Sequence, residues 1–210
     1  MKKIVFVDIP IYEKKDKLNY FNTGNVKSKY DKDVLYPINA VFAESLEKND
    51  ELKIVLLKSL TGDKNKDKQI DVNIETFKEE FNTAVKDKNI SVEYFPLESD
   101  FDETKENHEI RFKKMISCLE NDCELYADIT FGPKLIPMMI FCVFNFAERF
   151  FNCHINNIVY GKAIFDENNR AHDGELFDVS PMYHLNNLTN SMVAASGEDA
   201  IKNLDLFFAL

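Results

Sequence analysis

The sequence is poor in the residues that mark fibrous or low-complexity proteins. Its 210 residues include no tryptophan, 6 glycines, 6 prolines and 4 cysteines. This composition excludes collagen-like and largely disordered chains. With 45% hydrophobic residues, the chain can build one sizeable core, and its length favours a single core domain.

Long hydrophobic runs are also missing. The longest run covers residues 135–147, contains Pro137 and is interrupted by Asn145. A membrane span needs about 20 apolar residues, whereas runs of about 10–14 are more often buried helices. We therefore expect a buried helix here, no transmembrane segment and no membrane partner.

The cysteines form no recognisable pattern. Cys118, Cys123, Cys142 and Cys153 include no C-x-x-C pair, and the N-terminal apolar stretch is too short for a secretory leader. We expect reduced thiols in a cytoplasmic protein. The spacing of Cys142, Cys153 and His154 matches no zinc site, so no metal is expected.

Positive charge is scarce except at the N-terminus. The formal net charge is −10, which argues against binding of duplex nucleic acid. Residues 1–32 nevertheless hold eight lysines against four acids and carry +4, which leaves −14 for the remaining chain. The N-terminal end is therefore the part that favours an anionic ligand.

Short apolar runs alternate with amphipathic stretches along the chain. The pattern predicts strands at 4–8, 52–58, 90–95, 124–129 and 155–160, and helices at 34–48, 72–86, 103–119 and 133–151. A small hairpin is expected at 18–30, a solvated loop at 61–68, a polar hairpin at 162–179, and two helices at 181–210 broken at Ser196 and Gly197. This order predicts an α/β, Rossmann-like doubly wound fold with a mainly parallel sheet, peripheral hairpins and C-terminal exit helices. Residues 1–180 form the expected ligand-binding domain, and 181–210 the helical segment.

The most informative segment is A-D-I-T-F-G-P-K at residues 127–134. It joins a strand to a helix, where Thr130 offers a hydroxyl, Gly132 permits close approach of a ligand, and Pro133 suits a first helical turn. Lys134 adds a charge to the amide groups of that turn, which together favour an anion. The alternative is an ordinary turn with a structural Gly-Pro pair. Asp128, near the end of the strand, is a candidate base or a cap of the following turn.

A second candidate loop follows Asp8. Ile9, Pro10, Ile11 and Tyr12 lead into Lys14, Lys15 and Lys17. Because the first strand and the strand that ends near Asp128 lie near the centre of such a sheet, the two loops are expected side by side. Tyr12 could stack on a base and the lysines could meet phosphate, although each lysine alone is typical of a solvated charge run.

Common catalytic and nucleotide motifs are missing. The sequence has no G-x-G-x-x-G, no P-loop, no G-x-S-x-G and no H-E-x-x-H. The four histidines show no catalytic pattern and are expected at surface or capping positions: His108, His154, His172 and His184.

Three segments resemble CRISPR-associated Rossmann-fold (CARF) domains. They are I-V-F-V-D with the lysine-bearing segment after it, A-D-I-T-F-G-P-K-L-I-P-M-M, and I-N-N-I-V-Y-G-K-A with a hairpin into L-F-D-V-S-P-M. The resemblance covers residues 2–179 and implies a homodimer, without cofactor, that binds cyclic tetra- or hexa-adenylate in type III CRISPR antiviral defence. It places the following residues at the ligand: Asp8, Ile9, Pro10, Ile11, Tyr12, Asp128, Thr130, Phe131, Gly132, Pro133, Lys134, Tyr160 and Gly161. Phe131 departs from the family, since many relatives have a small or polar residue there.

The resemblance leaves three functions open. The first is a non-catalytic sensor that relays ligand binding allosterically to an effector domain absent from this chain. The second is a ring nuclease in which the 2′-hydroxyl of the ligand attacks without a metal, with Lys134, Thr130 and Tyr12 as candidate catalytic residues. The third, unrelated to CRISPR, is a Rossmann-like module for assembly or for a small nucleotide.

Overall fold

The computed structural model describes residues 2–13, 16–21, 23–26 and 28–209, and these divide into two compact units, residues 1–180 and 181–210. The strands are β1 (Lys3–Asp8), β2 (Glu51–Leu60), β3 (Ser91–Asp100), β4 (Glu124–Asp128), β5 (His154–Phe165) and β6 (Ala171–Asp178). The helices are α1 (Pro37–Ser45), α2 (Lys64–Ala84), α3 (Lys105–Ile116), α4 (Ile136–Phe151), α5 (Ser180–Ser191) and α6 (Gly197–Phe208).

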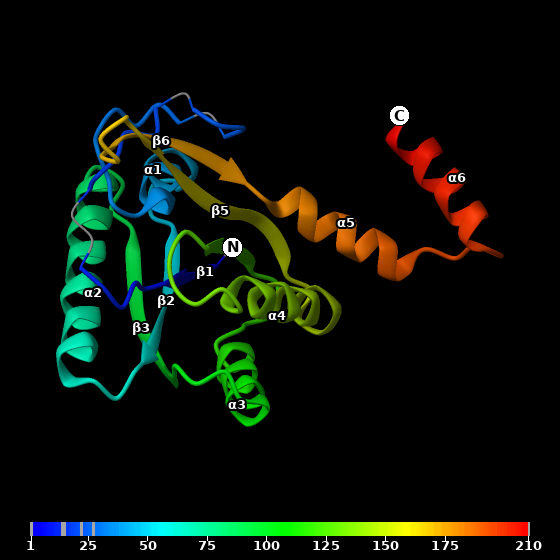
Figure 1. Ribbon diagram of the computed structural model, residues 1–210, viewed down its shortest axis with the longest axis horizontal. Coiled ribbons are helices and arrows are strands. Elements are labelled where there is room, and N and C mark those ends of the chain that lie inside the picture. Colours follow the sequence, from blue (N-terminus) through cyan, green and yellow to red (C-terminus); the bar gives the residue numbers. More distant parts are fainter. Residues whose placement is uncertain (1, 14–15, 22, 27, 210) are drawn as a thin grey trace. The chain divides into compact units, whose positions relative to one another are not determined.

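The strands of the described chain form one sheet in the order β3-β2-β1-β4-β5-β6. The first five are parallel, and β6 returns antiparallel to β5 as a hairpin. Helices α1 and α2 pack together on one face and α3 and α4 on the other, as Figure 1 shows. The predicted Rossmann-like α/β fold is therefore confirmed. The strand order reverses between β1 and β4, and a doubly wound sheet binds its ligands at this switch point.

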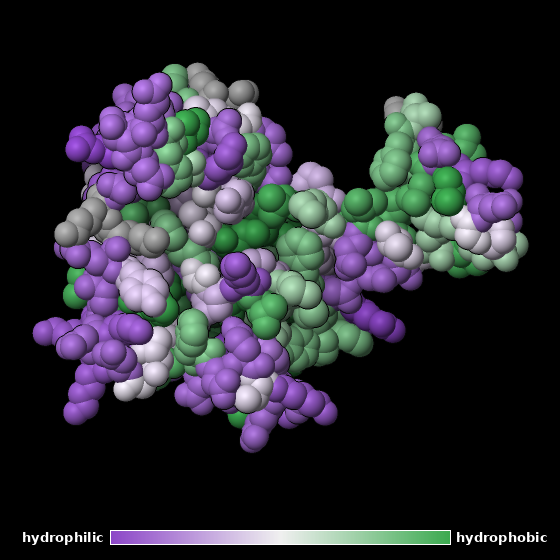
Figure 2. Space-filling model, viewed as in Figure 1, coloured by the Kyte–Doolittle hydropathy of each residue, from purple (hydrophilic) through white to green (hydrophobic). Residues whose placement is uncertain are grey.

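The central strands are buried on both faces because helices cover each face of the sheet. All six residues of β1 are buried, which explains its unbroken apolar run. Phe6 on β1 packs against Phe144 on α4, and Phe42 on α1 packs against Phe81 and Tyr126. Figure 2 shows hydrophobic residues gathered over α4 and hydrophilic residues over α2 and α3.

Three sequence-based expectations about local structure are wrong. Residues 64–68 are not a loop but the first turn of α2, which begins where the Asp63 side chain accepts the amides of Asn65 and Lys66. The expected hairpin at 18–30 is replaced by isolated bridges, Leu18 with Val34 and Phe21 with Ser28, while Asn22 and Lys27 lie outside the described residues. Helix α4 begins at Ile136 rather than Pro133.

The C-terminal unit contains the expected pair of helices, interrupted at residues 192–196. Ser196 caps α6 by accepting the amide of Asp199, and no residue of α6 is buried. No helix in the described part of the chain is long and apolar enough to cross a bilayer.

The free thiols lie apart from the carboxyl ends of the strands. Sγ of Cys123, just before β4, and Sγ of Cys153, just before β5, lie 3.2 Å apart in the interior. Among the described residues, no three histidine, cysteine or acidic side chains are grouped as metal ligands are.

Candidate functional site

Two cavities adjoin the residues that follow the carboxyl end of β4. One, of about 560 Å³, lies between the loops that follow β1 and β4, and we call it the switch-point cavity. The other, of about 570 Å³, lies against the β5–β6 hairpin, and we call it the hairpin cavity. Thr130 and Phe131 line both cavities and separate them.

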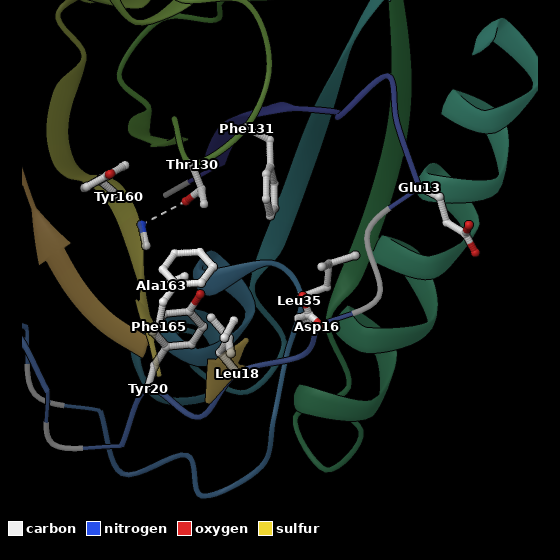
Figure 3. A pocket seen from close by; sticks show the side chains of 12 residues that line it. Glu13, Asp16, Leu18, Tyr20, Leu35, Thr130, Phe131, Tyr160, Ala163 and Phe165 are labelled. Atoms are coloured by element: carbon white, nitrogen blue, oxygen red, sulfur yellow. Dashed lines mark hydrogen bonds between the residues drawn. The ribbon is translucent and has the colours of Figure 1, made fainter. Parts of the chain in front are cut away.

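The structure brings most of the predicted ligand residues to these cavities. The switch-point cavity is lined by Pro10, Ile11, Tyr12, Phe101, Glu103, Thr130, Phe131, Gly132, Pro133, Lys134 and Leu135. The hairpin cavity, drawn in Figure 3, is lined by Glu13, Asp16, Leu18, Tyr20, Leu35, Thr130, Phe131, Tyr160, Gly161, Ala163, Phe165 and Ala171. The remaining predicted residues, Asp8, Ile9 and Asp128, are buried and line neither cavity. Lys14 and Lys15 lie outside the described residues.

Gly132 joins the two loops of the switch-point cavity. Its φ of +88° is one that side chains rarely adopt, and a Cβ placed on it would stand 2.0 Å from Oδ2 of Asp8. The Asp8 carboxylate therefore lies directly beneath the turn that follows β4. Only glycine allows this approach. Packing against Asp8 therefore explains the glycine at position 132 without any ligand.

Asp128 is a capping residue. Its Oδ1 accepts the amide of Thr130 at 2.9 Å, and its Oδ2 accepts the amide of Ile38 in the first turn of α1 at 3.2 Å. Burial raises the pKa of Asp128, and its hydrogen bonds with Thr130 and Ile38 oppose that shift. Of the two sequence-based interpretations, base or cap, the geometry favours the cap.

The Thr130 hydroxyl is also engaged. It accepts the amide of Gly161 on β5 at 2.9 Å (Figure 3). Thr130 thus connects β4 to β5 at the wall shared by the two cavities. The role that the structure shows for this side chain is to hold the turn after β4 against β5.

The amide groups at the start of α4 are arranged differently from the expectation. The helix begins with Leu135 as its N-cap and without a side-chain cap, and the amide of Ile136 donates to the Pro133 carbonyl. Lys134 therefore lies in the turn before the helix, where it is exposed and makes no ion pair with a described residue. Lys134 lines the switch-point cavity beside the positive end of the α4 dipole, but the first helical turn offers few free amides, because that of Ile136 is already bonded and Pro137 has none.

Two residues of α2 that the sequence analysis missed fix the loops. Asn73 Nδ2 donates to the carbonyls of Pro10 at 2.7 Å and Tyr12 at 3.0 Å. Glu80 accepts the amides of Leu35 and Tyr36 and pairs with Lys17 at 2.9 Å. Both are polar residues inside the buried stripe of α2, and this interruption of an apolar pattern was the signal that could have identified them.

Tyr12 forms one wall of the switch-point cavity. Tyr12 is 58% exposed, and the Lys66 ammonium lies 5.6 Å from the centre of its ring. Lys66 is thus a second cation near this cavity. It lies in the first turn of α2, which the sequence analysis predicted to be a loop. An aromatic ring beside an ammonium group suits a ligand that carries both a base and a phosphate.

The fold and these cavities define a Rossmann-like α/β domain with a preformed cavity at its topological switch point. No protein-family model matches the sequence, and no curated protein matches it significantly.

Asp8 makes the stability of the protein depend on pH. Burial raises the pKa of this carboxyl well above its usual range, the Arg111 charge opposes the shift, and the charge of Asp128 adds to it. The folded protein therefore binds this proton more tightly than the unfolded chain. Protonated Asp8 therefore contributes to the free energy of unfolding. This contribution is complete below the ordinary pKa of aspartate, which applies to the unfolded chain, and it is lost as the pH rises through the higher pKa of Asp8 in the folded protein.

We expect Asp8→Asn to flatten this dependence. Between about pH 4 and pH 7, the free energy of unfolding of the wild type should fall relative to that of the variant, at most by about 1.4 kcal/mol per pH unit. Urea unfolding at several pH values measures the difference. A difference between the two proteins that does not change with pH contradicts the raised pKa.

Proposed function

We propose that the chain is the sensor domain of a CARF-type protein, which binds cyclic oligoadenylate as a homodimer and relays the binding to an effector domain. The observation that carries the proposal is the switch-point cavity. Residues 10–12 and 130–134, from the two loops implied by the resemblance, line this one cavity although more than 100 residues separate them in the chain. Ligands of doubly wound folds bind at this place.

The local charges support an anionic ligand at the switch-point cavity. Lys134 and Lys66 contribute positive charge, and the N-terminal end of the α4 dipole contributes partial positive charge. Glu103, the acidic residue of this cavity, is paired with Arg111 at 3.4 Å, which offsets its charge. An acidic protein can thus attract a phosphate ring through a local field.

A cyclic oligoadenylate also fits the symmetry of a dimer. A ring with two or three identical repeats on each side suits a twofold axis, across which two copies present the same cavity. Lys134 from each protomer would then meet one side of the ring. Sedimentation with and without the ring tests the dimer.

The binding test uses a matched pair of charge reversals. Isothermal titration with cyclic tetra- and hexa-adenylate compares wild type, Lys134→Glu and Lys48→Glu, a control in the exposed turn between α1 and β2, at the opposite edge of the sheet. Lys134→Glu should weaken binding by about tenfold or more, the loss expected for a hydrogen bond to a charged group. Lys48→Glu should leave it unchanged.

Chromatography of the rings recovered after incubation with the protein decides between the candidate functions. Uncut ring recovered after incubation supports the sensor, whereas linear products identify a ring nuclease. Absence of binding of either ring to the wild type overturns the proposal and leaves the assembly or small-nucleotide module.

A further inference from the structure

Two of the four cysteines face each other at the amino ends of neighbouring strands. Glu124 of β4 is paired with His154 of β5, so Cys123 and Cys153, which directly precede them, stand opposite each other. The amide of His154 donates to the Cys123 carbonyl at 2.9 Å, which holds the two segments together at this point. Neighbouring strands lie about 4.8 Å apart, within the range of Cα separations that a disulfide spans. The backbone therefore needs no large movement to accept a covalent bond between these side chains.

The sulfur atoms of these two cysteines are already in contact. Sγ of Cys123 and Sγ of Cys153 lie 3.2 Å apart and share a hydrogen bond in which either thiol can donate. Both are free thiols, and both are buried. To form an S–S bond, the two sulfur atoms would have to approach each other by only about 1 Å. The side chains are therefore arranged as the reduced form of a disulfide.

The two thiols differ in how close they lie to solvent. Cys123 is 0% exposed, and burial raises the pKa of its thiol, with a further contribution from its hydrogen bond to Cys153. Cys153 is 7% exposed, and its Sγ donates to the Glu120 carbonyl at 3.3 Å. The chain beside it is held by an exposed hydrogen bond from Asn152 Nδ2 to Asp122 Oδ1 at 2.6 Å, and exposed bonds open readily. A small reagent therefore meets Cys153 first, with Cys123 directly behind it.

We propose that Cys123 and Cys153 form a site of reversible oxidation by a small hydroperoxide. With hydrogen peroxide, the Cys153 thiolate attacks one oxygen and the O–O bond breaks, which leaves a sulfenic acid, while the released hydroxide takes the thiol proton and becomes water. Cys123 then attacks this sulfur and the S–O bond breaks, so the second hydroxide takes the Cys123 proton. In total the two thiols lose two electrons and two protons, and the peroxide is reduced to two waters. A thiol reductant reverses the oxidation.

The disulfide closes one structural unit of the domain into a covalent loop. Its two cysteines are 30 positions apart, and the chain between them contains β4, the turn that lines both cavities, and α4. A cross-link of this length restricts the unfolded chain and thereby stabilises the folded one. The thiols lie at the amino ends of the strands, whereas the switch-point cavity lies at the carboxyl ends. The proposal therefore does not depend on the ligand proposed for that cavity.

The test is oxidation of the folded, reduced chain with hydrogen peroxide, followed by peptide mapping. Tryptic digestion without reductant should release residues 115–134 joined to residues 150–162, each of which holds one member of the pair. The cross-linked protein should melt about 5 °C or more above the reduced protein, and dithiothreitol should restore the original melting temperature. Oxidation of the exposed Cys142, in residues 135–149, shows that the dose of peroxide was sufficient.

Matched variants identify the cysteines that react. Cys123→Ala and Cys153→Ala should each abolish the cross-link, whereas Cys142→Ala and Cys118→Ala should retain it. Cys118 is the necessary control because it shares residues 115–134 with Cys123. Thermal melting of the reduced proteins confirms that each variant is folded. Three results overturn the proposal: no cross-link in the wild type once Cys142 has reacted, a cross-link that survives Cys123→Ala, or a cross-link that lowers the melting temperature.

Discussion

Gly132→Ala should be among the most damaging substitutions in the protein. The new Cβ would stand 2.0 Å from the Asp8 carboxylate, on a backbone with a φ of +88°. The φ alone costs about 1–2 kcal/mol, and overpacking adds about 1–3 kcal/mol. We expect a loss of about 2–5 kcal/mol in the free energy of unfolding, measured by urea denaturation.

Gly62 provides the control that separates strain from steric conflict. Its φ of +77° is similar, but a Cβ there would meet nothing within 4 Å. Gly62→Ala should therefore show only the backbone term of about 1–2 kcal/mol. In the double variant Asp8→Ala/Gly132→Ala, the part of the loss in the free energy of unfolding that comes from the steric conflict should be recovered. Equal losses for the two glycine variants are incompatible with a close approach of Asp8 to Gly132.

Arg111→Met should have the second large effect. The guanidinium is 1% exposed, and its Nε and Nη2 donate to Ser99 Oγ at 3.1 Å and to the Asp100 carbonyl at 2.6 Å, beside the pair with Glu103. Methionine keeps the apolar stem but leaves these acceptors and nearby Asp8 without the positive charge. Removing one partner of a buried charged group costs about 3 kcal/mol or more.

The control for Arg111 is Lys113→Met on the exposed side of α3. It removes the same charge without removing a buried hydrogen bond, so its effect on urea unfolding should stay within about 0.5 kcal/mol. Asp8→Asn should offset part of the Arg111→Met loss near pH 7, because the buried carboxylate is then absent. Similar losses for Arg111→Met and Lys113→Met contradict this role.

The sheet could be predicted because its signals are local. The strand β1 is one unbroken apolar run, and β4 ends at a turn whose Gly132 is recognisable in the sequence. The beginning of α2 was missed because residues 64–68 are hydrophilic and the buried stripe starts at Ile70. Asp63, which caps this helix, was the available signal.

The candidate site was predictable only in part. The switch-point cavity follows from a rule of topology, so residues 9–12 and 130–134 could be paired from the sequence. The hairpin cavity joins residues 13–35 to residues 160–171, through Tyr20 packed over Gly161 and Gly174. No local pattern marks that packing. Asp8 and Asp128 were placed correctly at strand ends, but their burial depends on tertiary contacts that no spacing reveals.

The phenyl ring of Phe131 is a wall of both cavities. It packs edge-on against the ring of Tyr36, and the two ring centres lie 5.6 Å apart. Any occupant that turns this ring alters the volume left on its other side. Thermodynamic linkage would then require reciprocity: whatever factor an occupant of one cavity imposes on the affinity of the other cavity for its ligand, that ligand must impose on the affinity for the first occupant.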